Sequence, residues 1–200
     1  MRAFVILGRT ATADDAFLLD DLPGTSGRLD VLLRCVRAAL LVSHGVRTDT
    51  RIYLVLLGGL RAPRVVRIRG DEAKFVRPDE RPLATLIKKS LAHPGLSVTF
   101  EPVRPGIAIA AGGLEAALDD AGALPLFLLD ENGADIAEVT LPEDALFVVG
   151  DHLGLGGDAR EILRARGAKA LAIGPVSVHS DDAIAVVSNA MDRSTRAPYP

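Results

Sequence analysis

Short apolar runs and helical stretches alternate through the second half of the chain. Three of the apolar runs, "LPLFLLD", "ALFVVG" and "AKALAIG", each lead into a turn rich in glycine or small polar residues. The stretches "DAREILRARG" and "DDAIAVVSNAMDR" have the spacing of amphipathic helices. Strands that alternate with helices in this way predict an α/β fold with a mostly parallel sheet. Such sheets bind ligands beyond the carboxyl ends of their strands.

The first half opens with the same kinds of element. Residues 2–8 and 51–59 are rich in aliphatic side chains and predict two buried strands. Between them, leucine and valine recur at helical spacing through residues 28–45, where Gly45 is the expected C-terminal cap. With 200 residues, of which 48% are hydrophobic, the chain is expected to bury the core of one domain.

Composition argues against several classes of protein. No apolar run approaches the roughly 20 residues that a membrane-spanning helix needs, so no membrane partner is expected. The single cysteine, Cys35, excludes an internal disulfide and a cysteine-only zinc site, which makes the reducing cytoplasm the expected compartment. The four histidines are scattered without the spacing of paired ligands, so no metal site is expected.

Charge is divided unevenly along the chain. Residues 1–104 hold 17 lysines and arginines against 11 acidic residues, whereas residues 105–200 hold 6 against 15. A basic half of this kind favours contact with a polyanion such as RNA. The alternative is that the two halves carry different solvated surface charges.

Four arginines lie in one short basic stretch. Residues 63–78 predict a β-hairpin that turns at Gly70 and Asp71, and two arginines of its first strand would share one face. A stripe of this kind suits phosphate groups. The candidates for RNA binding are therefore Arg61, Arg64, Arg67 and Arg69. The alternative is an edge strand whose charges prevent aggregation.

Three predicted strand ends in the second half have similar turns: "FLLDENG", "FVVGDHLGLGG" and "LAIGPVSVHS". If these ends are adjacent in one sheet, main chain and small aliphatic side chains line a cleft that suits a flat heterocycle such as adenine. The second turn has no Lys-Ser/Thr pair, so it is not a P-loop, and it lacks the full dinucleotide fingerprint. A nucleotide-like cofactor is thus indicated, with ordinary strand-ending turns as the alternative.

Three segments resemble one known family. "LPGTSGRLDVLLRCVRAALLVSHGVR", "VVGDHLGL" and "AIGPVSVHSDDAIAVVSNAMDR" are similar to the TrmY family of pseudouridine N1-methyltransferases. That family belongs to the SPOUT superfamily, whose α/β domain has a C-terminal trefoil knot that binds S-adenosylmethionine. The resemblance implies a single SPOUT domain over residues 1–200. Its basic first half, about 1–104, would bind the substrate, and the knot, about 105–195, would bind the cofactor.

The resemblance also implies which residues hold S-adenosylmethionine. Residues 173–178 would be the knot loop that wraps the adenine and methionine parts of the cofactor. The cofactor-binding residues that follow are Leu128, Leu129, Gly150, Ile173, Gly174, Pro175, Val176 and Ser177. Because alternate residues of a strand face opposite ways, one of the two leucines is expected to pack in the core. Archaeal members often have a cysteine a few residues beyond this loop, where this chain has "HSDDAIA".

The implied reaction is methyl transfer from the sulfonium of S-adenosylmethionine to N1 of pseudouridine. Catalysis would rest on in-line positioning and on removal of the N1 proton. In "SGRLD", Asp30 is the candidate base and Arg28 the candidate cation that stabilises charge on the ring carbonyls. The alternative for Asp30 is an interaction with the positive end of a helix. Asp151 and His152 lie where substrate and cofactor would meet, and stabilisation of a turn is the favoured interpretation for Asp151.

Partners follow from the same resemblance. Members of the family form homodimers through the knot region, and archaeal relatives act on position 54 of tRNA. We therefore expect an RNA methyltransferase with RNA, specifically tRNA, as its partner and no DNA partner. Three alternatives stay open: a non-catalytic RNA-binding SPOUT protein, a methyltransferase that acts on ribosomal RNA, and an enzyme that methylates a small molecule.

Overall fold

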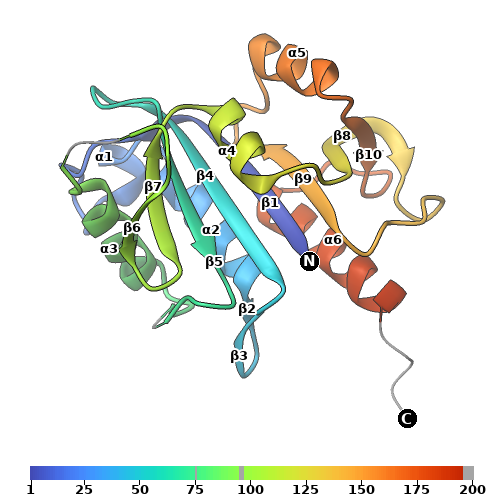
Figure 1. Ribbon diagram of the computed structural model, residues 1–200, viewed down its shortest axis with the longest axis horizontal. Coiled ribbons are helices and arrows are strands. Elements are labelled where there is room, and N and C mark those ends of the chain that lie inside the picture. Colours follow the sequence, from blue (N-terminus) through green and yellow to red (C-terminus); the bar gives the residue numbers. More distant parts are fainter. Residues whose placement is uncertain (75, 95–96, 196–200) are drawn as a thin grey trace.

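A mixed eight-stranded sheet forms the centre of the molecule in a computed structural model that describes residues 1–74, 76–94 and 97–195 (Figure 1). The strand order is β10-β8-β9-β1-β4-β5-β7-β6. The strands are β1 (Arg2–Thr12), β4 (Thr50–Gly58), β5 (Arg64–Arg69), β6 (Glu101–Arg104), β7 (Ile107–Ala111), β8 (Leu126–Asp135), β9 (Ala145–Gly150) and β10 (Lys169–Ala172). A two-residue pair, β2 (Leu41–Val42) and β3 (Gly45–Val46), forms a separate ribbon.

Parallel pairing joins β10, β8, β9, β1 and β4, as the alternation of strands and helices predicted. The other three strands, β5, β7 and β6, pair antiparallel. The carboxyl ends of the five parallel strands therefore lie at one edge of the sheet, and β5 begins at that same edge. The predicted cofactor cleft belongs to this edge.

Helices cover both faces of the sheet. They are α1 (Leu22–Thr25), α2 (Leu29–Leu40), α3 (Glu80–Leu91), α4 (Leu114–Ala121), α5 (Gly157–Ala165) and α6 (Ser180–Thr195). One core cluster joins α2, α3 and α6 to the sheet, and a second joins α4 and α5 to its opposite face. In Figure 1, α2 and α6 lie behind the strands and α4 lies in front.

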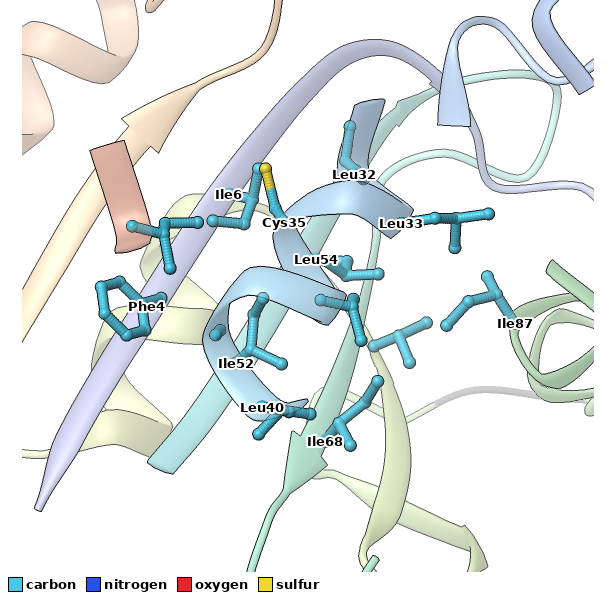
Figure 2. Packing of buried hydrophobic residues seen from close by; sticks show 14 of the residues in the cluster. Phe4, Ile6, Leu32, Leu33, Cys35, Leu40, Ile52, Leu54, Ile68 and Ile87 are labelled. Carbon is cyan, nitrogen blue, oxygen red and sulfur yellow. The ribbon is translucent and has the colours of Figure 1, made fainter. Parts of the chain in front are cut away.

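Alternation along β1 divides its side chains between these two cores. Phe4 and Ile6 pack toward α2, whereas Ala3, Val5 and Leu7 pack in the cluster on the other face. Figure 2 shows Phe4, Ile6, Cys35 and the leucines of α2 in the first core. All five β1 residues are 0–2% exposed, as expected of a strand covered on both faces.

Two predictions for the first half are wrong. The helix predicted over residues 28–45 ends at Leu40, because Leu41 is extended and begins the β2–β3 ribbon, so Gly45 lies in a strand and caps no helix. The hairpin predicted over residues 63–78 does not form. The chain turns at Gly70, but β5 pairs with β4 and β7, and no described residue between 71 and 78 belongs to a strand.

Candidate active site

The turn before α2 is fixed against the carboxyl end of β1. Ser26 is fully buried, and its hydroxyl donates to Leu22 O at 2.6 Å and accepts from Leu29 N at 3.1 Å. Gly27 has φ +60°, and a Cβ there would lie 1.9 Å from the carbonyl oxygen of Thr10. Arg28 follows with φ 68°, an uncommon conformation for a residue with a side chain. The turn thus gives Arg28 one defined position beside the end of β1.

Arg28, Asp30 and Arg34 form a charged cluster at the start of α2. Arg28 Nε and Nη2 donate to the two Asp30 carboxylate oxygens at 3.0 and 3.2 Å, and Arg34 Nη1 donates at 3.1 Å. Asp30 is 3% exposed, and this burial on its own raises its pKa. The hydrogen bonds and charges of the two arginines outweigh burial, so the pKa of Asp30 lies below its ordinary value. Asp30 is therefore an ionised acceptor with two cationic neighbours.

Asp151 lies at the end of β9, where it contacts β1. Its side chain accepts from Arg9 N at 2.7 Å and from Leu153 N at 2.8 Å, so it stabilises a turn, as the sequence favoured. The pKa of Arg28 is raised, first by the hydrogen bond and charge of Asp30 and to a smaller degree by the charge of Asp151. The Arg28–Asp30 pair and the β9 end are connected through β1, because Arg9 N donates to Asp151 and the next residue, Thr10, donates its hydroxyl to Gly27 O at 2.9 Å.

A small cavity of about 80 Å³ lies at the same sheet edge, between the ends of β8, β9 and β10 and the start of α6. Five of the predicted cofactor residues line it: Leu129, Ile173, Gly174, Val176 and Ser177. Val178, at the end of the predicted knot loop, also lines the cavity. The sequence prediction missed the rest of the wall: Asp130, Glu131, Val149, Leu171, Ser180 and Ala183. Strand alternation was a signal for Val149, since the residue before Gly150 faces the opposite side of β9.

Three predicted cofactor residues have other positions. Leu128 packs in the second core cluster, on the opposite face of β8 from Leu129. Pro175 is exposed and outside the cavity lining. Gly150 accepts a 2.7 Å hydrogen bond from the Ser180 hydroxyl, which ties the β9 end to the start of α6. Gly150 thus holds Ser180, which lines the cavity, in place.

The loop after β10 has free main-chain groups. Within residues 173–178, no backbone N–H or C=O group makes a hydrogen bond to any residue that the structure describes. The side chains of Val176 and Val178 are 69% and 46% exposed. Main-chain polar groups of a folded protein need partners, either water or a ligand. This loop therefore offers hydrogen bonds to a bound molecule beside aliphatic walls.

Asp130 closes the β8 side of the cavity. One carboxylate oxygen accepts from Asn132 N at 3.0 Å and from its side-chain amide at 3.1 Å, and the other accepts from Arg160 of α5. The hydrogen bond from the Asn132 backbone, followed by that from Arg160, lowers the pKa of Asp130. Asp130 thus stays ionised and holds the β8 turn in place.

Two of the four predicted RNA-binding arginines are tied to α3 and its ends. Arg64 is 8% exposed, and its guanidinium donates to Leu91 O at 2.9 Å. Arg61 pairs with Asp15 and donates to His93 O, both at 3.1 Å. Arg64 is therefore a buried structural residue, while Arg61 keeps a third of its side-chain surface exposed.

The other two share one face of β5, as predicted, and both have acidic partners. Arg67 donates to both oxygens of Asp120 at 2.6 and 2.8 Å and lies over the ring of Phe100. Arg69 pairs with Asp71 at 2.7 Å and Glu72 at 3.0 Å. A phosphate group would have to compete with these carboxylates.

Neither a metal site nor a membrane-spanning helix is present among the described residues. No group of three or more histidine, cysteine or acidic side chains among them is arranged to hold a metal ion. Among the same residues, no helix has the length and hydropathy required to cross a bilayer. Cys35 is buried in the first core cluster, where burial raises the pKa of its thiol.

The fold is that of an α/β protein with a small cavity and a charged helix start at one edge of its sheet. Residues 1–196 match a family described as "Putative SAM-dependent RNA methyltransferase", and the chain belongs to that family. A relative from Methanococcoides burtonii, named tRNA (pseudouridine(54)-N(1))-methyltransferase, is 35% identical over 97% of both chains. A protein of the same name from Haloferax volcanii is 36% identical over the full length of both.

A solved structure has the same fold. It is Nep1 of Archaeoglobus fulgidus bound to S-adenosylhomocysteine, with a TM-score of 0.62, 19% identity, and coverage of 96% of this chain and 98% of that one. At this identity the likeness establishes the α/β fold and its mostly parallel sheet.

Proposed function

We propose that this protein transfers the methyl group of S-adenosylmethionine to N1 of pseudouridine 54 in tRNA. The observation that carries the proposal is that the cavity beside the loop after β10 and the Arg28–Asp30 pair lie at the same edge of the sheet. A loop with unpaired main-chain groups lies beside an aliphatic cavity, and the hydrogen bond between Ser180 and Gly150 links that cavity to the turn of Asp151. The same turn is connected to the Arg28 turn through β1, since Arg9 N donates to Asp151 and the Thr10 hydroxyl donates to Gly27 O. The relatives with this name match nearly the whole chain.

The chemistry of the cavity fits the cofactor. Leu129 and Ile173 offer aliphatic surfaces to the adenine ring, and the free N–H groups of Gly174 and Val176 can donate to ring nitrogens or to the methionine carboxylate. The cavity of about 80 Å³ is smaller than the roughly 300 Å³ typical of small-molecule sites, so part of the cofactor would lie outside it. When bound, S-adenosylmethionine supplies an electrophilic methyl group on a sulfonium.

The pseudouridine ring that accepts the methyl group would lie against Arg28 and Asp30. Asp30 is ionised at neutral pH and can accept a hydrogen bond from N1–H and then its proton. Arg28, whose side chain is 41% exposed, can donate to a ring carbonyl and stabilise the negative charge that develops as N1 loses its proton. The bound position of the nucleoside would supply the alignment that the displacement requires.

We also propose that the C-terminal part forms a trefoil knot. Two contacts support the knot: β10 pairs with β8, and Ile136 N donates to Ala172 O at 2.8 Å, so the chain beyond β10 leaves beside the chain beyond β8. In this proposal residues 105–195 bind the cofactor, residues 1–104 bind RNA, and the two parts form one domain. Arg61 and Arg69, the most exposed of the four arginines in the basic stretch, are the ones we retain as phosphate contacts.

A second copy of the chain would cover the rest of the cofactor. Val176, Val178 and Val186 are 39–69% exposed around the start of α6, which is unusual for valine and is typical of a surface that packs against another protein. A homodimer through this region would enclose the ligand that the cavity leaves partly open. The cytoplasm, where tRNA is modified, is the compartment that this function requires.

Tritium transfer from labelled S-adenosylmethionine tests the function. The substrates are two tRNA transcripts that differ only in having pseudouridine or uridine at position 54, and a ribosomal RNA fragment that contains pseudouridine. We expect transfer only to the first. Transfer to the ribosomal fragment alone would replace tRNA as the substrate, and RNA binding with no transfer to any of them would favour a non-catalytic RNA-binding protein.

A further inference from the structure

A basic groove runs along the exposed side of α3. Its volume is about 350 Å³, and its lining includes four cationic side chains, those of Arg77, Arg81, Lys89 and Arg104. The other described residues that line it are Pro82, Thr85 and Leu86, so the groove has no acidic residue in its described wall. We name this feature the α3 groove.

Helical spacing puts two cations of the α3 groove, Arg81 and Lys89, on one side of α3. Arg81, Thr85 and Lys89 are four residues apart along α3 and therefore lie on one side of the helix. Arg77 precedes the helix at the same interval, and Arg104 comes from β6 at the edge of the sheet. In Figure 1, α3 and β6 lie side by side at the end of the molecule opposite α5 and β10. The four cations therefore line one groove from three neighbouring segments of the chain.

The positive charge of the α3 groove is largely uncompensated. Arg81 pairs with the exposed carboxylate of Asp20. Arg77, Lys89 and Arg104 form no ion pair or side-chain hydrogen bond with any residue that the structure describes. By contrast, all four arginines predicted for RNA binding already have protein partners. Like charges that gather without partners cost folding free energy, and an anionic ligand offsets that cost.

The α3 groove lies on the same side of the sheet as the Arg28–Asp30 pair. Helix α3 packs beside α2 on that face. The segment between β1 and α1 connects the two regions, because Lys88 donates to Phe17 O and Arg81 pairs with Asp20 in that segment. An RNA bound at the start of α2 can therefore extend its backbone toward α3.

We propose that the α3 groove binds the sugar–phosphate backbone of the substrate RNA and supplies most of the salt-dependent part of its affinity. This inference rests on the proposed function for the identity of the RNA. Phosphate contacts position a nucleic acid without reading its sequence. The groove thus anchors the tRNA while Arg28 and Asp30 meet the target base.

The test compares two double variants of equal charge. Arg77→Ala/Lys89→Ala removes two cations of the α3 groove, and Arg164→Ala/Lys169→Ala removes two exposed cations from α5 and β10. Dissociation constants for tRNA are measured by fluorescence anisotropy over a series of salt concentrations. We expect the groove variant to bind at least about tenfold more weakly and its log–log salt slope to fall by about 1.5–2, as for two lost phosphate contacts.

The control variant should keep the affinity and slope of the wild type, and S-adenosylmethionine affinity should be the same in all three proteins. Equal affinity and slope in the groove variant would overturn the inference, as would an equal loss in the control variant. A methyl-transfer assay on the wild-type protein distinguishes failure of this inference from failure of the proposed function. Absence of transfer by the wild type would refute the function, whereas a groove-dependent salt slope would still support the anchoring surface.

Discussion

Replacement of Asp30 by asparagine tests whether this carboxylate has a catalytic role or only a structural one. Asp30 is 3% exposed and accepts three hydrogen bonds, at 3.0, 3.2 and 3.1 Å, from two guanidinium groups. Asparagine keeps one acceptor oxygen and loses the charge. The two arginine side chains are 41% and 43% exposed, so water replaces much of what they lose. We therefore expect the free energy of unfolding to fall by only about 2 kcal/mol.

Catalysis should suffer far more than folding. A loss of about 2 kcal/mol lowers the melting temperature of a 200-residue protein by roughly 4–8 °C, and leaves it folded at 25 °C. Loss of a base that accepts the N1 proton should slow single-turnover methyl transfer by about 10²–10⁴-fold. The affinity for S-adenosylmethionine, measured by calorimetry, should not change.

Asp49→Asn is the matched control for this experiment. Asp49 accepts a 2.8 Å hydrogen bond from the buried Arg2, at the end of β1 that is farthest from the candidate site. This variant should also lose some stability but should transfer the methyl group at the wild-type rate. A rate for Asp30→Asn within about threefold of the wild type would refute the catalytic role and leave Asp30 as a helix-start carboxylate.

Three further predictions concern the scaffold. Gly27→Ala should destabilise the protein by about 2 kcal/mol or more and slow methyl transfer, because the new Cβ would lie 1.9 Å from Thr10 O at a φ of +60°. Urea unfolding and a transfer assay measure the two effects, and wild-type values for both would contradict the prediction. Tyr53→Phe should cost about 1 kcal/mol, or roughly 2–4 °C in melting temperature, because it removes a partly buried 2.8 Å hydrogen bond to Asp120. An unchanged melting temperature would show that this bond contributes nothing. Burial on its own would raise the pKa of Asp192, but the hydrogen bonds and charges of Arg47 and Arg2 outweigh burial, so the folded-state pKa lies below the ordinary value of 3.8. The ionised carboxylate therefore stabilises the fold above pH 3.8, and this stabilisation is lost as the pH falls through the folded-state pKa. Urea unfolding between pH 5 and pH 3 should therefore show a smaller pH dependence for Asp192→Asn than for the wild type, and equal slopes would contradict this assignment.

Local sequence patterns predicted the parallel part of the fold because its signals are local. The apolar run of β1, the helical spacing of α2 and the alternation after residue 120 each depend on a few adjacent residues. The antiparallel part was not predicted, although β4–β5 and β6–β7 are pairs of strands adjacent in sequence, because a short strand pattern does not specify its partner or direction. A pattern such as "RVVRIR" indicates a strand, but only the tertiary structure shows that its neighbours are β4 and β7.

The candidate site divides in the same way. The sequence pointed to the loop after β10 and to "SGRLD", and the structure brings both to one edge of the sheet. It could not reveal that Arg64 is buried or that Ser180 bonds to Gly150, since both depend on contacts between distant segments. The free cations of the α3 groove were missed for the same reason, because Arg104 joins Arg77 and Lys89 only after β6 has folded against α3.

Mass spectrometry of the methylated nucleoside tests the central claim most directly. The wild-type protein, in excess over a tRNA with pseudouridine at position 54, reacts once with S-adenosylmethionine, and the RNA is then digested and its fragments are sequenced. The proposed function, which takes its target position from the named relatives, predicts N1-methylpseudouridine at position 54. A methyl group on the ribose, on another ring atom or at another position would contradict the account.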